Sequence, residues 1–125
     1  MLKKILSHQD GCIATVVLNN PKKLNAIDLE MWTGLGKTMA SLSKNTELRC
    51  VVLRGAGGKA FAAGADISRF AEERSTRDQA AEYHRIIDIA MDAIYECLHP
   101  TVALIEGVCV GGGLEVAACC DMRFC

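Results

Sequence analysis

A carboxylate preceded by three glycines is the arrangement in this chain best suited to chemistry. One leucine joins the glycines to the acid at residues 111–115. The apolar segment before them, 101–105, predicts a buried strand, and the small residues after them, 116–120, are compatible with a helix. Three consecutive glycines cost backbone entropy, which indicates that this turn requires bare backbone. Backbone N–H groups beside a poorly hydrated carboxylate would suit acid–base chemistry, although a glutamate in a first helical turn is also an ordinary partner of the helix dipole.

A second glycine-rich segment, residues 55–60, follows another strand-like run and matches the Gly-x-Gly-x-x-Ala pattern of dinucleotide-binding folds. That pattern requires a helix that opens at the glycines and an acid about 20 positions later, at the end of the next strand. Here the glycines lead into another small-residue run, 61–67, and position 75 is a serine in a charged segment. A nucleotide-binding α/β domain is therefore an alternative that a titration with NAD would test. A phosphate-binding P-loop is excluded, because no Gly-Lys-Ser or Gly-Lys-Thr follows.

The segment 62–67 and the glycines at 111–113 are candidate partners in one site. Both follow apolar strands, and both consist of small residues that leave backbone N–H groups accessible. Two such groups directed at one oxygen form an oxyanion hole, which acyl transfer and enolate chemistry both require. The sequence therefore favours a site assembled from these two loops.

Three segments of the chain resemble the signature motifs of the crotonase superfamily, the group of enoyl-CoA hydratases and isomerases. Residues 20–26 resemble its N-terminal loop, and residues 61–67 and 105–115 resemble its two signature segments. The resemblance extends over the whole chain and corresponds to about the first half of a family member. It implies an α/β fold of the crotonase-like (ClpP/crotonase) type, a spiral of repeated ββα units that is truncated here. Residues 1–125 would be the N-terminal part of a single catalytic domain.

For the substrate, the resemblance implies an acyl thioester of coenzyme A whose oxygen is held by the backbone N–H groups of Ala65 and Gly112. Bulk at these positions would obstruct the thioester, which gives their small size a physical reason. Other positions would contact the substrate: Ala63, Asp66 and Ile67 along the acyl-CoA channel, and Lys22, Leu24 and Ala26 near the adenine and pantetheine portions. No metal and no separate cofactor are implied, because coenzyme A arrives with the substrate.

The contacts to the phosphates of coenzyme A stay open at this point. Lys22 and Lys23 fit a phosphate contact and a solvated loop equally well, since lone lysines usually lie at the surface. Many hydratases carry a lysine where this chain has Ser68, so one cation is missing there. Arg69 is the neighbouring candidate to replace it.

Glu115 bears on the type of reaction. Hydratases of the family use two glutamates around one water, and Glu115 matches the first, as general base or acid on that water. The second lies in a segment beyond Cys125. The match favours hydration of the 2,3 double bond of an enoyl-CoA over isomerisation, and a dehydration of the carnitinyl-CoA type is a close rival. A non-catalytic acyl-CoA-binding module is the alternative that the missing second glutamate motivates.

The elements expected to position these residues alternate between strands and helices. Asp28 is placed to cap a helix that runs to about Ser43, and Thr76, with Gln79 for a capping box, begins a long helix that Pro100 ends. The pattern also predicts strands at 12–18, 50–53, 102–105 and 122–124, a loop at 55–64, and a short helix that holds Glu115 in its first turn and continues through 116–120. This alternation indicates α/β layering. Because the chain stops where its last strand has just begun, we expect it to be part of a longer protein.

Composition limits the classes of function. The 125 residues are 50% hydrophobic and 23% charged, with 14 basic and 15 acidic side chains, which is typical of one globular domain. No basic patch with interleaved aromatic residues is present, so nucleic acid is not an expected partner. Apolar runs are far shorter than the ~18 residues of a membrane span, and the N-terminus lacks the apolar segment of a signal peptide. We therefore expect a cytoplasmic protein without membrane contact.

The seven cysteines form no Cys-x-x-Cys pair and have no metal-ligand spacing to the three histidines. Most lie within apolar patterns, and an odd count argues against a secreted disulfide framework. We expect buried, reduced thiols. From the resemblance alone we expect a homo-oligomer, either a trimer or a hexamer.

Overall fold

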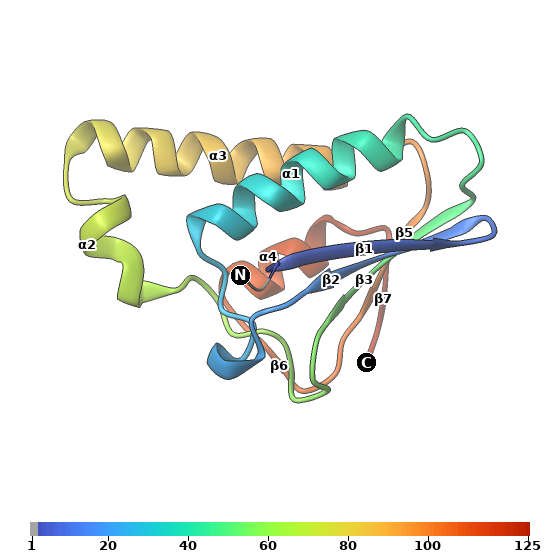
Figure 1. Cartoon of the computed structure of the whole chain (residues 1–125), viewed down its shortest axis with the longest axis horizontal. Helices are drawn as coiled ribbons and strands as arrows, with labels where there is room; N and C mark the ends of the chain where they lie inside the picture. Colours follow the sequence, from blue (N-terminus) through green and yellow to red (C-terminus); the bar gives the residue numbers. More distant parts are fainter. Residues whose placement is uncertain (1–2) are drawn as a thin grey trace.

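A five-stranded sheet lies at the centre of the computed structural model, which describes residues 3–125 (Figure 1). Across the sheet, its strands are β1 (Ile5–Asp10), β2 (Ile13–Leu18), β3 (Cys50–Gly55), β5 (Thr101–Leu104) and β7 (Met122–Phe124). β1 is antiparallel to β2, and every other neighbouring pair is parallel. Helices α1 (Leu29–Ser43) and α3 (Arg77–Tyr95) lie side by side over one face of the sheet.

The chain repeats a unit of two strands and a helix. The first unit is β1, β2 and α1; the second adds β4 (Ala60–Ala62) between β3 and α3; the third is β5, β6 (Val108–Cys109) and α4 (Gly112–Cys119). β4 and β6 pair in parallel as a separate two-stranded sheet. The 3₁₀ turns η1 (Pro21–Lys23) and η2 (Ile67–Arg69) and the short helix α2 (Phe70–Glu73) lie in the connections. The predicted α/β class with repeated ββα units is confirmed.

Helix α1 follows the sequence prediction closely. The Asp28 carboxylate accepts a hydrogen bond from the Met31 N–H at 2.9 Å, which satisfies one of the free N–H groups of the first turn. The buried stripe of the helix then faces the sheet and includes Trp32, Leu35 and Met39. The helix ends at Ser43, as predicted.

Helix α3 begins as predicted and ends earlier. The Thr76 hydroxyl accepts from the Gln79 N–H at 3.0 Å, but the Gln79 side chain accepts from the N–H of Ser75 rather than from that of Thr76. The helix ends at Tyr95, five residues before the expected stop at Pro100. No helix in residues 3–125 is both long and apolar enough to cross a membrane.

Three strands were not predicted. β1 and β6 lie in segments to which no element was assigned, and β4 lies inside the predicted loop 55–64. β4 and β6 are only three and two residues long, which is too short for an alternating pattern. Their strand conformation therefore depends on their pairing with each other. Helix α4 begins at Gly112, with Gly111 as its N-cap at φ +53°, so Glu115 lies in the first turn as expected.

The cysteines are all unpaired, but the expectation that they are buried is wrong for most of them. Only Cys120 is buried, and burial raises the pKa of its thiol to about 12. Cys12 and Cys125 are exposed, and the remaining four are half-buried. No group of three or more His, Cys, Asp or Glu side chains within residues 3–125 could hold a metal ion.

Candidate active site

Two loops that follow β4 and β6 pack directly against each other. Gly64, in the first loop, has φ +106°, a conformation that side chains rarely permit. A Cβ atom built on Gly64 would lie 3.5 Å from the Val110 carbonyl oxygen and 3.9 Å from the Gly112 nitrogen. A Cβ atom built on Gly111 would lie 3.5 Å from the Gly64 Cα. The predicted need for bare backbone therefore has a cause at Gly64 and Gly111: both have positive φ, which side chains rarely permit, where the two loops come into contact.

The backbone N–H groups of Ala65 and Gly112 lie near this contact. A Cβ atom built on Gly112 would be 3.9 Å from the Ala65 nitrogen. Neither N–H has a hydrogen-bond acceptor among residues 3–125, whereas Asp66 N–H donates to Ile27 O and Gly113 N–H donates to Val110 O. Gly112 is the first residue of α4, where the helix dipole favours negative charge. The loops thus present two free donors of the kind that stabilise an oxyanion.

The Trp32 side chain packs directly against Gly112. Its side chain is 1% exposed, and its Cζ2 atom would lie only 3.0 Å from a Cβ atom built on Gly112. The next residue is more tightly confined, because a Cβ atom on Gly113 would lie 2.3 Å from the carbonyl oxygen of Ala62 and 2.7 Å from its Cβ. Packing against α1 and β4 therefore disfavours a side chain at 112 and leaves no space for one at 113.

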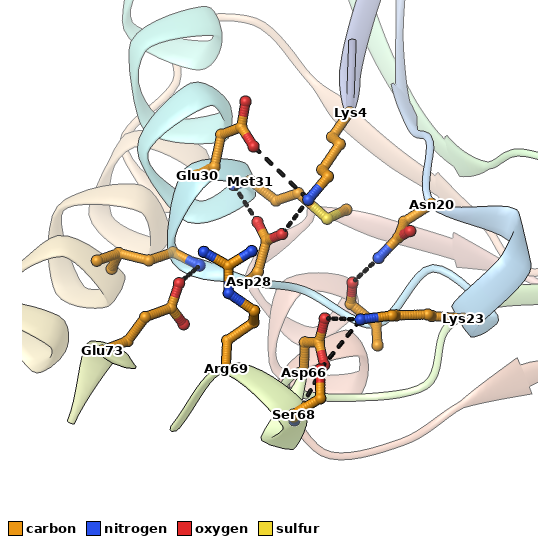
Figure 2. A network of polar contacts seen from close by, with 12 residues as sticks. Lys4, Asn20, Lys23, Asp28, Glu30, Met31, Asp66, Ser68, Arg69 and Glu73 are labelled. Carbon is orange, nitrogen blue, oxygen red and sulfur yellow. Dashed lines mark hydrogen bonds and ion pairs between the residues drawn. The ribbon is translucent and has the colours of Figure 1, made fainter. Parts of the chain in front are cut away.

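The main chain on either side of Ala65 is held by Ile27. The Ile27 N–H donates to the Gly64 carbonyl at 2.7 Å, and the Asp66 N–H donates to the Ile27 carbonyl at 2.9 Å, which makes a one-residue parallel bridge. The next residue, Asp28, caps α1 and is paired with Lys4 (Figure 2). The position of Ala65 is consequently tied to the start of α1.

Asp66 is bound on both carboxylate oxygens by groups of the protein itself. One oxygen accepts from the Ser68 N–H at 3.1 Å, and the other pairs with the Lys23 ammonium group at 3.1 Å (Figure 2). Burial alone would raise the pKa of Asp66, but the hydrogen bonds from Ser68 and Lys23 outweigh it and hold the pKa below its usual value. The carboxylate is therefore ionised, and both its oxygens bind groups of the protein itself.

Glu115 lies one turn into α4, and its carboxylate is exposed. The carboxylate has no hydrogen-bond or ion-pair partner within residues 3–125, whereas the Glu115 N–H donates to the Gly111 carbonyl. The expectation of a poorly hydrated acid is wrong for this chain, because Gly113, Val116 and Ala117 form the buried face of α4 and Glu115 does not belong to it.

Of the remaining predicted substrate contacts, two line a cavity and the others lie near it or near Asp66. Lys22 and Leu24 line a cavity of about 250 Å³; the other lining residues are Pro21, Asn25, Ala56, Gly57, Lys59 and Ala60. The Ala63 N–H donates to the Leu24 carbonyl at 3.0 Å, which joins this cavity to the loop that carries Ala65. Ala26 is half-buried, and Ile67 is 74% exposed next to Asp66.

Comparison with known proteins decides which family this arrangement represents. Residues 8–125 match the family model described as enoyl-CoA hydratase/isomerase. The chain belongs to the enoyl-CoA hydratase/isomerase family. The resemblance inferred from residues 20–26, 61–67 and 105–115 is thereby confirmed.

The relatives that this chain matches carry the names of different activities. A structure of an enoyl-CoA hydratase/carnithine racemase from Magnetospirillum magneticum is 45% identical with a TM-score of 0.93, over 98% of this chain and 46% of that one. A peroxisomal Delta(3,5)-Delta(2,4)-dienoyl-CoA isomerase from Arabidopsis thaliana is 31% identical, over 99% of this chain and 48% of the relative. A mitochondrial 3-hydroxyisobutyryl-CoA hydrolase from Mus musculus is 35% identical, over 91% of this chain and 30% of the relative.

The chain thus has the expected crotonase-type fold and spans less than half the length of these relatives. Enzymes of the enoyl-CoA hydratase/isomerase family act on coenzyme A thioesters, and the relatives' names include an isomerase and a hydrolase. Family membership therefore leaves the particular reaction open.

Sequence reasoning missed the contacts of two residues beside the site, Asn25 and Lys23. Asn25 is fully buried; its amide donates to the Ala56 and Ala60 carbonyls, and its oxygen accepts from the Asn20 N–H. An asparagine inside the 20–26 motif was an available signal for it. Lys23 gave no such signal, because its partner Asp66 is 43 residues away.

Proposed function

We propose that the chain binds the thioester group of an acyl-CoA with its carbonyl oxygen between the N–H groups of Ala65 and Gly112. The observation that carries this proposal is the pair of free, neighbouring donors at the contact of the two loops. Donors fixed in advance stabilise the oxygen most when it gains charge, and loss of one such donor typically costs ~10²–10³ in rate.

The reaction we propose is the addition of water to a 2-enoyl-CoA. Water adds to C3, the thioester becomes an enolate whose oxygen is held by the two N–H groups, and a proton is then delivered to C2. Glu115 stands three residues after Gly112 on α4, and residues at this spacing share one side of a helix. This placement supports Glu115 as the group that exchanges a proton with the water.

A second candidate function is acyl-CoA binding without turnover. The exposed, unpartnered Glu115 carboxylate favours it, because an effective general acid or base is held in a fixed position by its surroundings. Isomerisation and dehydration of acyl-CoAs use the same enolate, so these reactions are alternatives at the same site.

The amide signals of a ¹⁵N-labelled sample test the binding proposal. Acetyl-CoA is expected to shift the Ala65 and Gly112 amides downfield, whereas its thioether analogue S-ethyl-CoA, which lacks the carbonyl, leaves them nearly in place. Equal shifts with both ligands would rule out an oxyanion hole at these residues. Loss of crotonyl-CoA absorbance then separates hydration from binding alone.

The remaining expectations concern the rest of coenzyme A and the assembly. Lys22 and Lys59 border the cavity beside Leu24. Their positive charges suit this cavity to a phosphate-bearing part of the ligand. We propose no cofactor other than the coenzyme A of the substrate. A trimeric or hexameric assembly and a cytoplasmic location are predictions for light scattering and for cell fractionation.

A further inference from the structure

Lys23 and Asp66 form an ion pair between the η1 turn and the residue that follows Ala65 (Figure 2). The Lys23 ammonium also donates to the Ser68 hydroxyl at 3.0 Å. The Asp66 side chain is 5% exposed and that of Lys23 is 49% exposed. A buried carboxylate persists only when charge and hydrogen bonds compensate it, so Asp66 depends on these partners.

The Ala65 amide needs a restraint that its own sequence does not supply. Gly64 precedes it at φ +106°, and glycine permits many backbone conformations at little cost. The restraint must therefore come from Ile27, which bridges over Ala65, and from the C-terminal side. There, the Asp66 side chain binds the Ser68 N–H and begins η2.

We propose that Lys23 and Asp66 are positioning residues for the thioester oxygen, because their ion pair fixes the Ala65 N–H beside that of Gly112. This inference rests on the proposed function and names the residues that set the geometry of the site. It assigns Asp66 to the support of the oxyanion loop, since both its oxygens are bound within the protein.

The same contacts bear on whether Lys23 binds the phosphates. Its charge is offset by Asp66, and two of its donors are used by Asp66 and Ser68. Arg69 is paired with Glu72 at 3.2 Å. Lys22 has no ion-pair partner within residues 3–125, which leaves it better suited than Lys23 to an external anion.

Calorimetric titrations of the whole chain with acetyl-CoA and with S-ethyl-CoA test this inference. The ratio of the two dissociation constants isolates the contribution of the carbonyl, whereas both ligands share every phosphate contact. Lys23→Met removes the ammonium group, Lys23→Arg keeps a cationic donor, and Lys44→Met removes an exposed, unpaired lysine as the matched control. Ser68→Ala removes the two hydrogen bonds of the Ser68 hydroxyl, from Lys23 and to Asp66, and leaves the ion pair and the bond from the Ser68 N–H in place.

For Lys23→Met we expect the preference for acetyl-CoA to fall about fivefold, with affinity for S-ethyl-CoA unchanged. Lys23→Arg should restore most of it, Ser68→Ala should lose a smaller part, and Lys44→Met should equal the wild type. Equal weakening of both ligands in Lys23→Met, or no change in either, would overturn the inference. A wild-type chain that binds both ligands equally would instead refute the proposed function itself, and the inference with it.

Discussion

The two loops that provide the Ala65 and Gly112 amides are held in place in opposite ways. The first is tethered by polar contacts from distant residues: Ile27 bonds its main chain and Lys23 pairs with Asp66. The second has no side-chain tether at its glycines and is fixed by close packing against Trp32 and Ala62. One side of the site depends on electrostatics, and the other depends on the absence of side chains.

This difference predicts that substitutions in the two loops destabilise the protein in different ways. A change in the polar loop removes interactions that solvent partly replaces, so the loss is graded and depends on pH. A change in the glycine loop adds atoms where no space exists, so the backbone has to move. Substitutions on the two sides test whether this contrast is real.

Gly113→Ala is expected to have the largest effect on stability. Its new Cβ would lie 2.7 Å from the Ala62 Cβ, and Ala62 is fully buried in β4. Relief requires α4 and β4 to separate, which we expect to lower the free energy of unfolding by about 3 kcal/mol. Urea denaturation measures this loss. Ala118→Ser, at an exposed position of the same helix, is the control, and a Gly113→Ala variant as stable as the control would contradict steric fixation.

Gly112→Ala is expected to cost less stability and more binding. The obstacle is the Trp32 ring at 3.0 Å, a side chain that yields more easily than a backbone, so we expect a loss of about 1–2 kcal/mol. The shift of the ring and of α4 displaces one oxyanion donor, and the preference for acetyl-CoA over S-ethyl-CoA should fall at least tenfold. An unchanged preference would show that the Gly112 amide does not contact the carbonyl.

Asp66→Asn tests the polar side and should lower the free energy of unfolding by about 1 kcal/mol at pH 7. The folded-state pKa of Asp66 lies below its usual value, so its stabilising contribution is complete above about pH 4 and disappears as the pH falls through the lower, folded value. Wild type and variant should therefore converge in stability in acid. Chemical denaturation from pH 7 to pH 3 measures the difference, and a constant gap would exclude the ionised carboxylate as its source.

Local chemistry made much of this predictable from sequence. Side-chain caps act over three residues, so Asp28 and Thr76 identified the starts of α1 and α3. Glycine marks backbone conformations that other residues avoid, so the runs 61–67 and 111–113 indicated two loops that share one site.

The parts that escaped prediction depend on distant partners. Nothing near Lys23 identifies Asp66 as its partner, and nothing near Trp32 places it against Gly112. β4 and β6 exist because they pair with each other, not because of any pattern of their own. The exposure of Glu115 follows from which face of α4 packs on α3, which an apolar helix of small residues does not specify.

Glu115→Gln should have the smallest effect on stability and separates the chemistry of the site from its geometry. The exposed carboxylate has no partner within residues 3–125, so its unfolding curve should overlay that of the wild type. Hydration of crotonyl-CoA should nevertheless fall by ~10² or more, since amide cannot exchange the proton. The amide shifts of Ala65 and Gly112 with acetyl-CoA should persist. Glu115 would then contribute to proton transfer alone, whereas the two loops position the thioester. An unreduced hydration rate would remove Glu115 from the mechanism and leave only the two amides.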